Sequence, residues 1–74
     1  MSKNLSGKNI QIFRKAKGLS RKEVAQRLTD MGWETSTRHL ADMENGRCKI
    51  YDIDLLLLSH ILLVSINDLM ADGD

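Results

Sequence analysis

A chain of 74 residues has room for one domain, close to the lower size limit at which a hydrophobic core folds without cross-links. Its single cysteine excludes an internal disulfide and leaves too few thiols for a structural zinc site. No signal-peptide-like apolar segment opens the sequence, and apolar runs such as residues 55–58 are far too short to span a bilayer. We therefore expect a cytoplasmic protein with no membrane partner.

Charge is distributed unevenly along the chain. The formal net charge is only +1, so the molecule as a whole does not indicate a nucleic-acid partner. All 11 lysines and arginines, however, occur at or before Lys49, and beyond it the formally charged residues are all aspartates. A basic first two-thirds followed by an acidic end predicts two electrically different surfaces.

The apolar residues recur at helical spacing throughout, and β-branched alternation is absent, so the sequence predicts an all-α domain. The first helix is expected over residues 7–17, with Ser6 as its cap and Ile10 and Phe13 facing inward. Gly18 can supply the left-handed residue that ends it.

The second helix is expected over about residues 20–31. Ser20 and Glu23 have the spacing of a capping box, in which each side chain accepts a hydrogen bond from the other residue's backbone. Val24, Ala25 and Leu28 form its buried stripe. Residues 29–35 then connect it to the next helix, and we expect Trp33 within this connection to pack against the core.

The third helix, over about residues 36–45, begins at the Ser36 cap and has a narrow apolar stripe, Leu40 and Met43. Its other side chains are polar and are expected to point outward. The fourth helix begins near Asp52 and is apolar nearly all round. A final short helix is expected between the Ser65 cap and about Met70, with Asp68 as the capping-box partner of Ser65.

Three segments in this order, G-L-S-R-K-E-V-A-Q-R-L, L-A-D-M-E-N-G-R and L-L-V-S-I-N-D-L-M, carry a family resemblance. Over about residues 10–70 the chain resembles the Cro/repressor-type (XRE-like) helix-turn-helix family. The resemblance implies a compact five-helix, lambda-repressor-like fold, with residues 1–74 as a single domain. The segment T-D-M-G-W-E-T makes the turn between the second and third helices longer than is usual in that family.

The resemblance also implies a function. In such domains the second helix crosses the DNA backbone and the third enters the major groove. We therefore expect a sequence-specific DNA-binding transcriptional regulator of bacterial or phage origin, a repressor, that binds double-stranded DNA as a homodimer. Two alternatives remain: the antitoxin of a toxin–antitoxin pair, and a protein-interaction module that no longer binds DNA. No cofactor or small-molecule ligand is evident.

Residues expected to contact DNA fall into two groups. Among the base-reading candidates, Arg38 presents a guanidinium fork that fits guanine O6 and N7, whereas Asp42 either accepts from a cytosine amino group or orients Arg38. The base-reading group is Thr37, Arg38 and Asp42. The phosphate-binding group is Ser20, Arg21, Ser36, His39, Asn45, Arg47 and Lys49.

Two further predictions concern the scaffold. Arg14 and Glu44 match positions that form a partly buried ion pair in relatives, the alternative being two unrelated surface charges. The fourth and fifth helices carry more apolar residues than a small domain can bury. Leu55, Leu58 and Leu62 serve the core, and the surplus comprises Leu56, Leu57, Ile61, Leu63, Ile66 and Met70. Since a large exposed apolar patch marks an interface, we expect a dimer through Leu63, Ile66 and Met70.

The sequence gives no indication of catalysis or of a metal site. His39, His60 and Cys48 belong to different expected elements, so they are poor candidates for shared metal ligation. A Cys–His dyad would lack an orienting third group and an oxyanion hole. We therefore expect no metal and no enzymatic activity.

Overall fold

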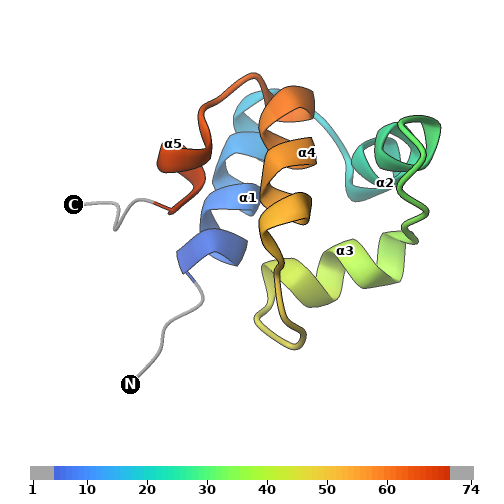
Figure 1. Ribbon diagram of the computed structural model, residues 1–74, viewed down its shortest axis with the longest axis horizontal. Coiled ribbons are helices and arrows are strands. Elements are labelled where there is room, and N and C mark those ends of the chain that lie inside the picture. The colour runs from blue at the N-terminus through green and yellow to red at the C-terminus, as the bar shows by residue number, and fades with distance from the viewer. Residues whose placement is uncertain (1–4, 71–74) are drawn as a thin grey trace.

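Five helices and no strand are formed by residues 5–70, the part of the chain that a computed structural model describes (Figure 1). They are α1 (Leu5–Ala16), α2 (Arg21–Asp30), α3 (Thr37–Glu44), α4 (Asp52–Leu62) and α5 (Ile66–Met70). The predicted all-α class and the number of helices are confirmed. No helix in this range is long and apolar enough to cross a membrane.

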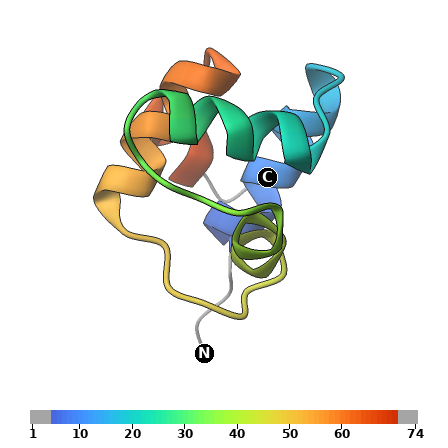
Figure 2. The same ribbon diagram turned by 90° about the vertical axis from the view of Figure 1, so that its right-hand side faces the viewer.

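The helices pack around one core. α1 contacts α3, α4 and α5, and α2 contacts α3 and α4. In the turned view of Figure 2, α3 is seen along its axis and α2 runs above it. Each of the helices α1 to α4 contributes at least two buried side chains to this packing, and the short α5 contributes Leu69. The apolar core comprises Ile10, Val24, Leu28, Leu40, Met43, Leu55, Leu58, Ile61, Leu62 and Leu69.

Serine side chains define the starts of three helices, as predicted. The Glu23 backbone N–H donates to Ser20 Oγ at 3.1 Å, and the Ser20 N–H donates to Glu23 Oε1 at 2.9 Å. Ser65 and Asp68 form the same reciprocal pair before α5. The predicted Ser6 cap is wrong, because α1 already includes Leu5 and Ser6. Serine is tolerated in a first turn, where backbone N–H groups have no intrahelical acceptor.

Four helices end in the same way, with one residue in the left-handed region. The N–H of the residue that follows it then donates to the carbonyl five residues back, as Leu19 does to Arg14 (3.1 Å). The left-handed residues are Gly18, Gly32, Gly46 and Leu63. Leu63 has φ 58°, and a leucine held there costs about 1–2 kcal/mol because its Cβ approaches the following carbonyl oxygen.

Trp33 lies at the surface and is held there by a hydrogen bond. Its indole Nε1–H donates to Asp54 Oδ1 at 2.8 Å, and Asp54 Oδ2 accepts the backbone N–H of Tyr51 at 2.9 Å. The expectation that Trp33 packs against the core is wrong, since the residue is 38% exposed and is not among those packed against the core. Its polar N–H is satisfied by a carboxylate that lies at the first turn of α4, so the connector 31–36 is fixed to that helix.

Candidate nucleic-acid interface

The outer side of α3 is polar and open to solvent. Thr37, Arg38 and His39 are exposed, and Asp42 is half-buried. The inner side buries Leu40, Met43 and Glu44. Residues three and four apart share a helix face, so this division follows from the narrow apolar stripe of the sequence. The helix can therefore present its first turn to a ligand while its last turn stays inside the protein.

Arg38 and Asp42 face each other on this outer side. Arg38 Nε lies 3.6 Å from Asp42 Oδ1, with the Arg38 side chain 82% exposed and that of Asp42 28% exposed. This separation makes an ion pair but is too long for a hydrogen bond. The geometry favours the second of the two roles expected for Asp42, orientation of Arg38, and it leaves the donors of the guanidinium available.

The serine cap of α3 retains a hydroxyl donor for an anion. Ser36 Oγ accepts the His39 backbone N–H at 3.0 Å, just as Ser20 Oγ accepts that of Glu23. The Ser36 hydroxyl proton is not required by its cap, whereas the Ser20 hydroxyl also acts on the Glu23 carboxyl. The Ser20 backbone N–H, and after it the Ser20 hydroxyl, lowers the pKa of the Glu23 carboxyl below its ordinary value of 4.5.

The loop between α3 and α4 exposes its polar residues and anchors itself with apolar ones. Asn45, Arg47 and Lys49 are exposed, whereas Cys48 and Ile50 pack against the core. Burial, and then the nearby charges of Asp42 and Asp54, raise the pKa of the Cys48 thiol. A thiol with a raised pKa stays protonated at neutral pH and is a poor nucleophile.

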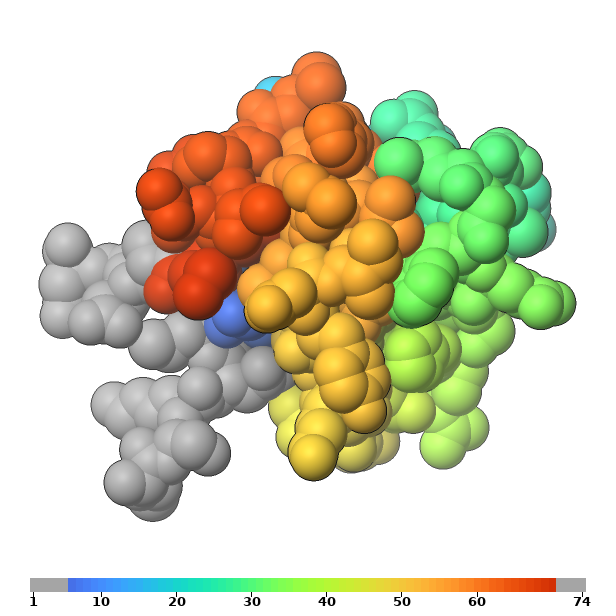
Figure 3. Space-filling view, in the orientation of Figure 1, coloured from blue at the N-terminus to red at the C-terminus, as the bar shows by residue number. Residues whose placement is uncertain are grey.

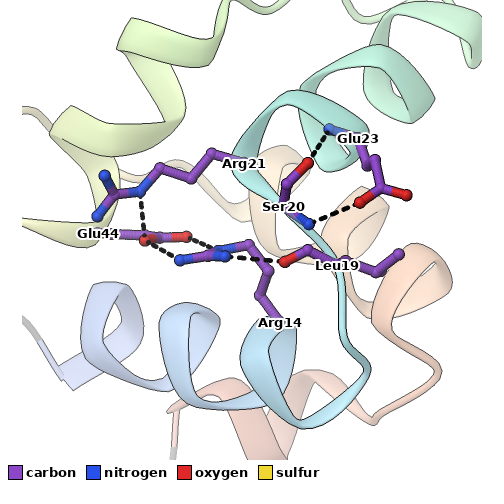
Figure 4. Close-up of polar contacts among 6 residues, drawn as sticks. All are labelled: Arg14, Leu19, Ser20, Arg21, Glu23 and Glu44. Carbon is purple, nitrogen blue, oxygen red and sulfur yellow. Dashed lines mark hydrogen bonds and ion pairs between the residues drawn. The ribbon is translucent and has the colours of Figure 1, made fainter.

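The predicted ion pair between Arg14 and Glu44 is present, and it is buried (Figure 4). Arg14 Nε donates to Glu44 Oε2 at 2.7 Å and Arg14 Nη2 donates to Oε1 at 3.1 Å. The third donor of the fork, Arg14 Nη1, reaches the carbonyl of Leu19 at 2.8 Å. The pair therefore joins α1 to α3 and also holds the turn between α1 and α2.

A second arginine shares the same carboxylate. Arg21 Nε donates to Glu44 Oε1 at 2.9 Å, which completes an arginine–glutamate triad of Arg14, Glu44 and Arg21. The Glu44 side chain is fully buried, that of Arg14 is 8% exposed and that of Arg21 is 34% exposed. Sequence reasoning assigned Arg21 to phosphate alone and missed this contact. No local pattern could reveal it, because the two residues are 23 positions apart.

The triad places the first turn of α2 beside the last turn of α3. Ser20 and Arg21 therefore lie at the same end of α3 as the loop that carries Asn45, Arg47 and Lys49. The predicted phosphate ligands thus form two groups. Ser36 and His39 lie at the opposite end of α3, together with the base-reading candidates Thr37 and Arg38.

Part of the predicted dimer surface is exposed. Leu63 and Met70 are the most open apolar side chains of the α4–α5 corner, and Leu56 is also exposed. Ile66 and Leu57 are half-buried against the core. Ile61, counted in the apolar surplus, is instead buried in the core, because it follows Leu58 by three positions on the inner face of α4. Figure 3 shows α4 and α5 side by side on one face of the molecule.

Within residues 5–70, no three His, Cys, Asp or Glu side chains gather in a way that could hold a metal ion. No protein-family model matches this chain, and no curated protein or solved structure matches it.

Proposed function

We propose that this chain is a sequence-specific DNA-binding regulator of transcription, a repressor, with α2 and α3 as its helix-turn-helix. In this proposal the five helices have the lambda-repressor-like arrangement and α3 lies in the major groove. The observation that carries the proposal is the division of α3 into an exposed polar first turn and a buried last turn. A helix that reads base edges needs side chains free to reach them and a rigid attachment behind them.

The basic residues around α3 support this proposal. Arg38 extends from the first turn, where a groove-inserted helix contacts bases, and Arg47 and Lys49 extend from the loop beyond the last turn. The formal net charge of the whole chain is only +1. DNA binding would therefore depend on a few basic side chains at defined positions and much less on the net charge of the protein.

Selection of bound sites from random duplex DNA tests the proposal directly. We expect enrichment of a two-fold symmetric sequence, with half-sites about one helical turn apart. Failure to bind any duplex at low salt would contradict DNA binding and would favour the protein-interaction module.

Two substitutions separate base reading from backbone contact. Arg38→Ala should remove about 1–3 kcal/mol of preference at one base pair per half-site, because the guanidinium fork is lost. Arg47→Ala should weaken binding to operator and scrambled DNA alike, and should reduce the log–log salt slope by about 0.9 per bound copy. Both variants are titrated against both duplexes across a salt series. Full operator preference in Arg38→Ala would contradict the placement of α3 in the groove.

We further propose that the protein acts as a dimer through the α4–α5 corner. Leu63 supports this, because it is 76% exposed and also occupies a left-handed position that favours glycine. An isolated subunit gains nothing from leucine there, whereas a partner surface could bury its side chain.

Leu63→Gly should therefore weaken the dimer while leaving the stability of the subunit nearly unchanged. It relieves backbone strain but adds unfolded-state entropy, so the stability of the subunit should stay within about 1 kcal/mol of the parent. Dimer dissociation should become easier, since a buried leucine contributes about 1.5–3 kcal/mol. Sedimentation over a concentration series measures dimer dissociation, and urea unfolding measures the stability of the subunit. An unchanged dimer constant, or a parent that is strictly monomeric even when bound to DNA, would contradict this interface.

A further inference from the structure

The arginine–glutamate triad holds one more positive charge than its carboxylate requires. Arg14 alone donates to both Glu44 oxygens, at 2.7 and 3.1 Å, which is the fork geometry that best compensates a buried carboxylate. Arg21 adds a third hydrogen bond to Oε1, which already has a donor. Two guanidinium groups and one carboxylate leave a net charge of +1 at this junction of α1, α2 and α3.

The excess charge resides on the most exposed member of the triad. Arg21 uses only its Nε on Glu44, and within residues 5–70 neither of its terminal nitrogens makes a hydrogen bond. In Figure 4 the tip of its guanidinium is directed away from the Glu44 carboxylate. The side chain is 34% exposed, so a ligand could reach those donors from solvent.

This arrangement resembles a ligand site more than a structural ion pair. A guanidinium held at Nε has lost much of its rotational freedom before any ligand arrives, and its two outer N–H groups still form a fork that matches two oxygens of a phosphate. A lysine at the same position would offer a point charge on a flexible stem. Preorganisation of this kind raises affinity by reducing the entropy lost on binding.

We infer that Glu44 is a positioning residue that aims Arg21 at a phosphodiester of the DNA backbone. Glu44 thus has a second role besides its buried pair with Arg14. It is also the last residue of α3. A phosphate bound by Arg21 is therefore connected, through one hydrogen-bonded carboxylate, to the end of the helix proposed to read bases. The identity of the phosphate as that of DNA rests on the proposed function.

Three variants test this inference by binding to one duplex across a salt series. Arg21→Met removes the charge but leaves Glu44 with both bonds from Arg14. It should lower the log–log salt slope by about 0.9 per bound copy, and so weaken binding about eightfold per copy at 0.1 M salt. Arg21→Lys keeps a cation and should keep the parental slope, with an affinity between those of the parent and Arg21→Met. Arg27→Met removes the same charge from an exposed position on α2. Its affinity for the duplex should match that of the parent within about twofold at salt concentrations that screen general electrostatic attraction.

Each departure from this pattern has a definite meaning. If Arg21→Met kept the log–log salt slope of the parent, Arg21 would bind no phosphate and would serve only as a member of the arginine–glutamate triad. Parental affinity in Arg21→Lys would show that charge alone matters, which would overturn the positioning role of Glu44. A loss of thermal stability by itself cannot imitate either result, because the salt slope counts ionic contacts in the folded protein.

A second measurement keeps the inference separate from the proposed function. Titration with inorganic phosphate at constant ionic strength should move the Nε–H resonance of Arg21 in the parent and leave that of Arg27 in place. If the parent binds no DNA but this shift occurs, the proposed function fails while the phosphate site stands. If neither DNA binding nor the shift is seen, both fail.

Discussion

The two ends of α3 carry the same chemistry, an arginine beside an acidic side chain, in opposite environments. At the C-terminal end, Glu44 is fully buried and receives three hydrogen bonds from two arginines. At the N-terminal end, Arg38 is 82% exposed and lies 3.6 Å from Asp42, without a hydrogen bond. The first arrangement fixes the helix to the rest of the fold. The second leaves a side chain free to adjust to whatever α3 meets.

The difference shows how burial determines what a charge pair does. A buried carboxylate has lost its hydration, so Glu44 requires the fork of Arg14, and removal of that fork leaves the carboxylate poorly compensated. An exposed pair exchanges protein contacts for water at almost no cost. One helix can therefore be rigid at one end and adaptable at the other, as a recognition element needs to be.

The largest loss of stability is expected at Arg14, and it tests whether the buried end of α3 depends on its charges. Arg14→Met removes both fork hydrogen bonds from Glu44 and should lower the free energy of unfolding by about 3–5 kcal/mol, because Arg21 alone cannot satisfy both oxygens. Urea unfolding followed by circular dichroism measures the loss. Arg27→Met, an exposed arginine of α2, should stay within about 0.5 kcal/mol. If the two variants had the same midpoint, the triad would be superficial.

An intermediate effect is expected at Trp33, which holds the connector leading into the N-terminal end of α3. Trp33→Phe keeps a ring but removes the N–H that Asp54 accepts. The loss should be about 1.5 kcal/mol, the lower end for a hydrogen bond to a charged group, since the indole is partly exposed. Met31→Leu, an exposed apolar change in the same connector, is the control. A difference between these variants of less than about 0.5 kcal/mol would show that the bond does not hold the connector.

The smallest effect is expected at Asp42. Asp42→Asn removes the exposed ion pair with Arg38 and should change the free energy of unfolding by no more than about 0.5 kcal/mol. The same urea experiment measures it, with Arg14→Met as the opposite extreme. A loss above about 1.5 kcal/mol would mean that the two ends of α3 are equally dependent on their charges.

Much of the local structure could be predicted from single stretches of sequence. The Ser20–Glu23 and Ser65–Asp68 pairs are bonds between residues three positions apart, so residue type and spacing suffice to predict them. The start of α1 was missed at Ser6, where a serine is compatible with both a cap and a first turn. Arg14 and Glu44 were paired only through family resemblance, since 30 positions separate them.

Five helices, the serine caps of three of them, the narrow apolar stripe of α3 and the glycine that ends α1 could be predicted from the sequence alone, because each depends on interactions within a few residues. The contact of Arg21 with Glu44, the bond from Trp33 to Asp54 across 21 positions and the burial of Ile61 became known only from the tertiary structure. These outcomes depend on how helices cross, and crossing geometry is set by packing of the whole core. The spacing of residues within one helix does not predict how that helix crosses its neighbours.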